Sequence, residues 1–411
     1  MKTYVKRDII NIVGITVCLL IGLLLLHDIC KSSILENTVW NNYELQARAW
    51  LKGQTYLDAN NPALELAYYE GRYYVSFPPF PSVFLLPFML IFGSNLPGNL
   101  IIALVCIATV IIAYLTLRKA GTSDLMAVFI AVFYVFGSNM LFMSLNSGVW
   151  FLAQALNMLL CTLAVKFCLD DNRTASFICL SLAVGCRPFS AIYIIAFIII
   201  YIIRDNKKLS IKRNVLPLIP VVCAAAIYMA YNYIRFKNVF EFGHNYLPEF
   251  QSEYSRQFSV SYLWENLKRL LIKSISLDSS LNLSIDKLNG FMFYIANPIF
   301  IIGIVRAVKD IIKGRINHTK LILSIAMVIN ILALCCHKTL GGWQFGARYT
   351  CDMIPFVLMC FLSDSGERKE VKQSGKRFSF PVSFNRFEIA VAVFAVMFNI
   401  FGAVEFWTNT L

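Results

Sequence analysis

Long apolar stretches recur from one end of this chain to the other, and they constrain its fold more than any other feature of the sequence. A helix needs about 20 consecutive apolar residues to cross the hydrocarbon core of a bilayer. Eleven stretches approach or reach that length, at 9–27, 98–117, 124–143, 147–169, 174–186, 188–203, 214–235, 290–305, 321–337, 349–363 and 388–407. They predict an all-α polytopic membrane protein with a bundle of about eleven transmembrane helices.

Two of the eleven stretches are short and flank the dipeptide Arg187-Pro188. Residues 174–186 and 188–203 therefore form either two short spans or a broken pair that neighbouring helices bury. Because of this pair, the sequence supports a count of ten to twelve spans.

The composition excludes a soluble enzyme and a disordered chain. Of the 411 residues, 58% are hydrophobic and 15% are charged, whereas about 25% of the residues in a soluble domain are charged. Most of the 12 cysteines lie inside apolar runs, where cysteine behaves as a small hydrophobic residue. No C-x-x-C pair occurs and the four histidines are scattered, so we predict no metal and no cofactor.

The positive charge of the chain indicates its orientation in the membrane. The net charge is +13. With a cytoplasmic N-terminus and alternating spans, the inner segments hold 23 basic and 10 acidic residues, and the outer segments hold 14 of each. This is the positive-inside distribution, which predicts a multi-pass protein of the cytoplasmic membrane whose partner is the lipid bilayer. No basic stripe with interleaved aromatic residues occurs, which argues against a nucleic-acid ligand.

This topology divides the chain into three parts. Residues 1–363 form the bundle, residues 364–387 a basic cytoplasmic linker, and residues 388–411 a C-terminal transmembrane helix. The first apolar run follows a basic N-terminus and lacks a small-x-small cleavage site, which is typical of an uncleaved signal anchor. Function is expected in the outer loops, because they hold the motif-bearing sequence that does not span the membrane. Those loops are residues 28–97, 236–289 and 338–348.

The first outer loop carries three local patterns. Aromatic residues at helical spacing predict an interfacial amphipathic helix over 38–52 that ends at Gly53. The run YYEGRYY at 68–74 predicts a tight hairpin, which either stacks on a flat polar substrate or packs on the bundle as a lid. The Pro-rich segment 77–82 leads into 82–92, which would rise only about 16 Å as a helix and is predicted to be a juxtamembrane helix.

Four stretches resemble, in order, motifs of the GT-C glycosyltransferase superfamily, in particular its bacterial protein mannosyltransferase-like and aminoarabinose transferase-like enzymes. They are YYEGRYYVSFPPFPSVFLLPF at 68–88, GCRP at 185–188, YNYIRF with FEFGH at 231–244, and GGWQFGARY at 341–349 followed by Asp352 and Pro355. The resemblance covers about residues 1–365. It implies a GT-C-like bundle that moves a sugar from a polyprenyl-phosphate carrier to an envelope acceptor at the outer face of the cytoplasmic membrane. Neither the sugar nor the acceptor can be identified from the sequence.

The resemblance also implies where the chemistry would lie. In the family, a carboxylate of the first outer loop acts as base on the acceptor, and basic groups hold the leaving phosphate. Many relatives have an Asp shortly before a Tyr at the start of the interfacial helix, where this chain has Asn41 and Asn42. Because Asn cannot take up a proton as Asp does, either another carboxylate serves or the activity is lost. The other carboxylates are Glu65, just before the hairpin, Glu36 and Glu44.

Arginine suits the leaving phosphate, because its planar fork pairs with phosphate oxygens. Arg348 is the first candidate, since it lies at the mouth of a span. Its alternative is an ion pair with Asp352, four residues further on. Arg72, in the hairpin, is a second candidate for the donor phosphate. Arg187 lies within apolar sequence, where a functional role and a buried pair that joins helices both stay open.

Three further polar residues complete the motifs. Asn232 and Arg235 are supporting residues of the third motif, and His244 is expected to be a satisfied surface histidine. Two other functions remain open besides sugar transfer. A lipid-linked sugar flippase or transporter would have paired broken helices in two related halves, and no internal repeat is found. A non-catalytic membrane scaffold is favoured by the Asn pair in place of Asp.

Overall fold

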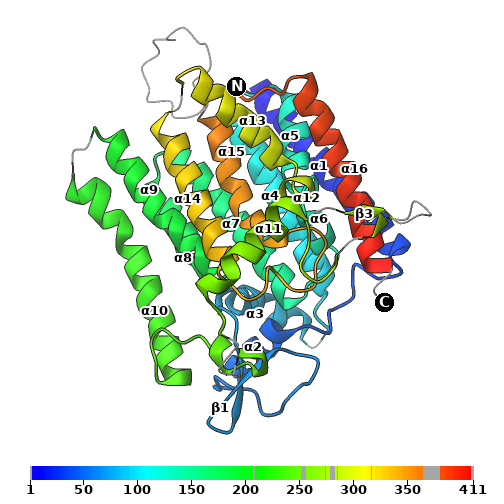
Figure 1. Cartoon of the computed structure of the whole chain (residues 1–411), viewed down its shortest axis with the longest axis vertical. Coiled ribbons are helices and arrows are strands. Elements are labelled where there is room, and N and C mark those ends of the chain that lie inside the picture. Colours follow the sequence, from blue (N-terminus) through cyan, green and yellow to red (C-terminus); the bar gives the residue numbers. More distant parts are fainter. Residues whose placement is uncertain are drawn as a thin grey trace.

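The helices form one bundle that carries a cap of short elements at one end and the N-terminus at the other (Figure 1). The structure, a computed structural model, describes residues 2–93, 95–206, 209–250, 256–273, 275–277, 283–284, 286–315, 317–363 and 380–408. The predicted linker 364–387 therefore lies mostly outside the described residues.

Apolar helices stand at all eleven predicted positions, and they make up the body of the bundle. They are α1 (Lys2–Ile29), α4 (Gly98–Lys119), α5 (Asp124–Phe136), α6 (Met140–Met143), α7 (Val149–Leu169), α8 (Arg173–Val184), α9 (Ala191–Arg204), α10 (Ile219–Phe236), α12 (Phe293–Ala296), α13 (Ile299–Ile312), α14 (His318–Cys335), α15 (Ile354–Leu362) and α16 (Arg386–Thr408). The short turns η1 (Pro188–Ser190), η2 (Ile211–Val215), η3 (Leu216–Leu218) and η7 (Arg348–Met353) extend α9, α10 and α15 at their N-termini.

Six helical segments among the described residues are long and apolar enough to cross a membrane. They are Lys6–Ile29, Gly98–Lys119, Val149–Leu169, Ile211–Phe236, His318–Cys335 and Arg386–Thr408. The other predicted spans are shorter helices or helix pairs, such as α5 with α6 and α12 with α13. The chain is thus a helical integral membrane protein, in which five of the eleven predicted spans are too short or too interrupted to cross as single long helices.

The helices are interrupted next to a proline or a buried asparagine, where the regular backbone hydrogen bonds of the helix are not formed. The pair 174–186 and 188–203 is broken at Arg187, as predicted, with η1 between α8 and α9. Continuous helices over 124–143 and 290–305 were also predicted, and this is wrong. The first breaks between α5 and α6, and the second breaks at Asn297-Pro298 between α12 and α13.

A buried amide pair explains both unexpected breaks. The Asn297 side chain accepts a hydrogen bond from the Asn139 backbone N–H at 2.7 Å and donates one to the Asn139 side-chain oxygen at 2.9 Å. Both residues are fully buried. Asn139 Oδ1 also accepts from the Ala347 backbone N–H at 2.9 Å. A buried polar group must be hydrogen-bonded, and here the two breaks satisfy each other and hold the third outer loop.

Ion pairs join helix ends near the N-terminal end of the bundle. Arg118 at the end of α4 contacts Asp8 of α1 at 3.0 Å, and Arg173 at the start of α8 contacts Asp205, just after α9, at 2.8 Å. These are charges that the sequence assigned to the inner face. Their placement at one end of the bundle agrees with the predicted alternation of loops, while the cytoplasmic orientation itself stays a prediction.

The opposite end is capped by the first outer loop (Figure 1). The predicted hairpin is confirmed: β1 (Leu66–Tyr69) pairs antiparallel with β2 (Arg72–Val75). Glu70 and Gly71 have φ of 46° and 78°, which is the left-handed pair that a two-residue hairpin turn needs. The juxtamembrane helix is confirmed as α3 (Phe80–Phe92).

The predicted interfacial helix differs from the expectation in length and burial. It is α2 (Asn42–Leu51), shorter than 38–52, and it packs on α3 and β2. Tyr43 and Ala47 are buried within the protein, so that face meets protein and not headgroups. The cap is completed by η4 (His244–Tyr246), η5 (Pro248–Phe250), η6 (Val260–Tyr262), α11 (Leu263–Ile272) and the strand pair β3 (Ser276–Leu277) and β4 (Leu283–Ser284).

Candidate active site

A cavity of about 290 Å³ lies beneath the cap, and all four motif stretches contribute to its wall. Phe77 comes from the first stretch, Arg187 from the second, His244 from the third and Tyr349 from the fourth. Trp150, at the start of α7, also lines it. Phe77 and Tyr349 are 272 residues apart in the chain, and the bundle brings the motifs together at the end away from the N-terminus.

Arg187 supplies the cation of this cavity. It follows α8 in an extended conformation, with φ −140° and ψ 106°, as expected of a residue before proline. Its Nε–H donates to Asp352 Oδ2 at 3.0 Å, and its guanidinium lies 4.3 Å from the centre of the Tyr349 ring. The bond to Asp352 takes up one of five N–H donors, and the side chain still borders the cavity.

Arg348 is buried and is held by uncharged groups. Its Nε–H donates to the Gly341 carbonyl at 3.1 Å, and its Nη1 donates to Gln154 Oε1 at 2.9 Å. The pairing of Arg348 with Asp352 that the sequence offered as an alternative is therefore not formed, because Asp352 contacts Arg187 and Asn157. The Arg348 side chain thus ties the third outer loop to α7, behind the cavity wall.

Glu65 lies at the rim, connected to the cavity by an indole. The Trp150 Nε1–H donates to Glu65 Oε2 at 3.3 Å. The residue is exposed at its outer side, yet protein atoms crowd the carboxylate. This loss of hydration raises the pKa of Glu65 above its ordinary value, the Trp150 bond opposes the shift, and the charge of Glu249 adds to it. Asn42 donates its side-chain N–H to the Glu65 carbonyl at 3.2 Å, which positions this segment.

The other two carboxylate candidates lie elsewhere. Glu44 is buried and accepts hydrogen bonds from Arg48 and Asn37 within the cap. Glu36 is exposed and accepts from the Ser33 backbone N–H at 3.3 Å. Neither residue borders the cavity. Glu44 holds the start of α2 in place. Glu65 does not line the cavity either, but its carboxylate accepts a hydrogen bond from Trp150, which does.

Arg72 is also remote from the cavity. Its guanidinium lies 4.2 Å from the centre of the Tyr56 ring, on the outer side of the hairpin. Arg235 and Asn232 form a structural unit beneath that hairpin. Arg235 Nη1 donates to the Val75 carbonyl at 2.8 Å and Nη2 donates to Asn232 Oδ1 at 3.1 Å. The third motif therefore fastens β2 to the end of α10.

Two histidines line the cavity, and the sequence analysis missed both. His244 is half-buried, not a surface residue, with Nδ1 2.7 Å from the Ser76 carbonyl. Because Nδ1 donates to this carbonyl, Nε2 is an acceptor in the neutral ring, and burial lowers the pKa of His244 to about 4. His337 is buried, and burial lowers its pKa as well. Its Nδ1 lies 2.8 Å from the Thr339 carbonyl. A single histidine within a motif does not indicate, from the sequence, that its side chain lines a cavity.

The cavity combines one fixed cation, two neutral imidazoles and aromatic walls. A guanidinium next to aromatic faces can bind an anionic oxygen of a ligand. Neutral imidazole nitrogens can accept a hydrogen bond from a hydroxyl group. No group of three or more His, Cys, Asp or Glu residues that could hold a metal ion occurs in the part of the chain that the structure describes.

Comparison with known proteins finds two similar solved structures. One is ArnT from Cupriavidus metallidurans bound to undecaprenyl phosphate, with 12% sequence identity, a TM-score of 0.45, and coverage of 84% of this chain and 58% of that one. The other is the apo Archaeoglobus fulgidus oligosaccharyltransferase, with 12% identity, a TM-score of 0.47, and coverage of 96% and 56%. This chain spans less than three fifths of either protein. No protein-family profile and no curated protein matches the sequence.

Proposed function

We propose that this protein transfers a sugar from a polyprenyl-phosphate carrier to an acceptor at the capped end of the bundle. The observation that carries the proposal is the convergence of four separate motif stretches on one cavity whose wall includes the guanidinium of Arg187. The resemblance of those stretches to GT-C glycosyltransferases supplies the reaction class. An integral membrane bundle supplies a hydrophobic environment for the lipid part of such a donor.

In this proposal Arg187 binds the donor phosphate. Asp352 and Tyr349 fix the guanidinium at the cavity wall, so that the donors that Asp352 does not use can reach phosphate oxygens as the sugar leaves. A preformed cation stabilises the developing negative charge most where water is excluded. Arg348 serves by holding the third outer loop, which immediately precedes Tyr349.

Glu65 is the proposed base on the acceptor hydroxyl. A base near the operating pH is the most effective, and the raised pKa moves Glu65 in that direction. The Trp150 contact places the carboxylate at the rim, where an acceptor would enter from the aqueous side. Asn42, near the position where many family members have Asp, then positions the Glu65 backbone.

A direct assay tests the proposal. Purified protein in lipid nanodiscs is incubated with radiolabelled polyprenyl-phosphate sugars and a membrane extract as the source of acceptor. We expect donor consumption by the wild type, a loss of at least tenfold in Arg187→Ala, and unchanged turnover in Arg72→Ala, whose guanidinium lies outside the cavity.

Donor binding separates the alternatives. The protein could bind the donor, transfer none of the sugars tested, and still move the donor across the bilayer. That result would assign the cavity to a flippase. Neither binding nor turnover in well-folded wild-type protein would favour the scaffold that the Asn41-Asn42 pair suggests, and would contradict the proposal.

A further inference from the structure

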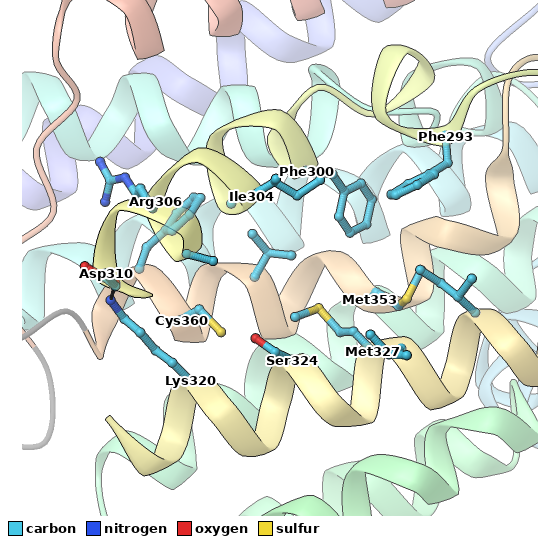
Figure 2. Close-up of a pocket in the computed structure, with 16 residues that line it drawn as sticks. Phe293, Phe300, Ile304, Arg306, Asp310, Lys320, Ser324, Met327, Met353 and Cys360 are labelled. Atoms are coloured by element: carbon cyan, nitrogen blue, oxygen red, sulfur yellow. Dashed lines mark hydrogen bonds and ion pairs between the residues drawn. The ribbon is translucent and has the colours of Figure 1, made fainter. Parts of the chain in front are cut away.

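A second hollow lies at the other end of the bundle, between α13 and α14, with α15 as its floor (Figure 2). Its volume is about 270 Å³ and its wall is almost entirely apolar, with Phe300, Met327 and Cys360 among the residues that line it. Both α13 and α14 pack on α15. The apolar rims are open: Ile304 on α13 is 50% exposed and Val328 on α14 is 55% exposed. In a membrane this groove therefore faces hydrocarbon.

One end of the groove is charged (Figure 2). Lys320 of α14 pairs with Asp310 of α13 there, and Arg306 contacts Glu388 of α16 at 2.6 Å. Another hollow, of about 490 Å³, adjoins this charged end of the groove. It shares Arg306 and Asp310 with the groove. Thus the apolar groove continues into a polar chamber.

The polar chamber carries two lysines that face outward. Lys309 and Lys313 line it and are exposed. Both also border a third, apolar hollow of about 310 Å³ on the outer side of α13, with Val308 and Ile312. Lysines four residues apart lie on the same side of a helix, so their ammonium groups stand together beside lipid-facing apolar surface.

This region is separate from the candidate active site. Lys320 lies near the start of α14, whereas His337 of the active-site cavity lies just beyond its end. The 17 residues between them correspond to about 25 Å along the helix. The helix α13 and the start of α14, which form the charged end of the groove, lie at the end of the bundle that carries the N-terminus (Figure 1).

We propose that this groove binds one anionic phospholipid of the leaflet on the N-terminal side. An acyl chain lies along the groove between α13 and α14, and Lys309 and Lys313 bind the phosphate. Lysine binds phosphate as a point charge, and basic pockets between transmembrane helices are known sites for acidic headgroups. The apolar wall of the groove suits a hydrocarbon chain, and the two lysines beside its charged end favour an anionic headgroup over a neutral one. This site does not depend on the proposed transfer reaction.

Lipid retention in native mass spectrometry tests the proposal. The full chain is reconstituted with equal amounts of phosphatidylglycerol and phosphatidylcholine, then released in mild detergent. We expect one phosphatidylglycerol to stay bound to the wild type. In Lys309→Gln/Lys313→Gln its affinity should fall by roughly thirtyfold, as the loss of two lysines near an acidic headgroup implies, while Lys309→Arg/Lys313→Arg should retain it. The matched control is Lys52→Gln/Lys268→Gln, two exposed lysines of the cap, which should bind as the wild type does.

A second variant tests the apolar part. Ala307 lines the groove, and Ala307→Phe should block the acyl chain and abolish retention of the lipid, with thermal unfolding unchanged. Equal retention of phosphatidylcholine, or full retention in the Gln double variant, would overturn the proposal. So would preferential binding of a second copy of the chain in place of lipid. Because no sugar donor is used, the result is independent of whether the active-site assay succeeds.

Discussion

Asp352 pairs with Arg187, 165 residues earlier in the chain, and not with Arg348, four residues before it. The pair joins the break after α8 to the start of α15, and it is mostly buried: the side chains are 17% and 3% exposed. The pair therefore joins helices around the cavity and also orients Arg187 in the cavity wall. The predictions below start from this pair.

Removal of the carboxylate should destabilise the fold. Asp352→Asn leaves Arg187 without its counter-ion in a largely dry site, and breaking a buried pair in this way costs about 3–5 kcal/mol. Thermal unfolding in detergent should show a clear fall in Tm. The double variant Arg187→Gln/Asp352→Asn should lose less than the sum of the two single variants. Strict additivity would show that the two residues do not act as a pair.

The two arginines should respond differently to replacement by lysine. Arg187→Lys keeps the charge and loses the planar fork, so donor affinity should fall several-fold. Arg348→Lys should leave donor affinity close to that of the wild type, because its side chain bonds to Gly341 and Gln154 and not to the cavity.

Arg348 should contribute to stability, whereas Arg72 should not. Arg348→Ala should lower Tm and speed hydrogen exchange of residues 338–347, while Arg72→Ala should change neither. A loss of donor affinity in folded Arg348→Lys as large as in Arg187→Lys would return the phosphate to Arg348.

The role of Glu65 has a pH signature. Glu65→Gln should lower transfer at least about tenfold, the lower part of the usual range for loss of a general base. The raised pKa of Glu65 means that activity rises with pH over a higher range than an ordinary glutamate would give. Trp150→Phe removes the hydrogen bond that opposes this shift in pKa. The pH range over which activity rises should therefore move still higher. A pH profile that is identical in wild type and Trp150→Phe would argue against Glu65 as the base.

His244 should make the fold sensitive to acid. Its pKa is lowered to about 4 in the folded protein, against about 6.5 in an unfolded chain. Between these values the unfolded state binds the proton more readily, so stability falls as pH falls from about 6.5 toward 4. His244→Asn should reduce this dependence when Tm is measured across that range. A wild-type Tm that stays constant from pH 7 to 4 would contradict the burial of a neutral ring.

Cysteine accessibility tests the orientation of the bundle. With the exposed Cys18 and Cys223 replaced by Ser, an impermeant maleimide should label Arg72→Cys in intact cells. Lys313→Cys should react only after the membrane is opened. Labelling of Lys313→Cys from outside would reverse the predicted topology and place the candidate active site in the cytoplasm.

The sequence by itself determined the elements whose causes are local. Apolar runs placed a helix at each of the eleven predicted positions, Glu70-Gly71 placed the hairpin turn, and Pro188 placed the break after α8. Each follows from side chains within a few residues of one another. The sequence also named Glu65 and Arg187 as candidates, but it placed Arg348 ahead of Arg187 as the ligand of the donor phosphate.

Only the tertiary structure decided how the polar residues are used. Asn139, just before α6, and Asn297, just after α12, bond to one another across 158 residues, and no local pattern carries that information. Glu44 became a buried cap contact and His244 a cavity residue for the same reason. In an apolar bundle a buried polar group must find a partner, and the partner is chosen by helix packing. Hydrophobic periodicity fixes where helices form, whereas the pairing of sparse polar groups between helices fixes where the site lies.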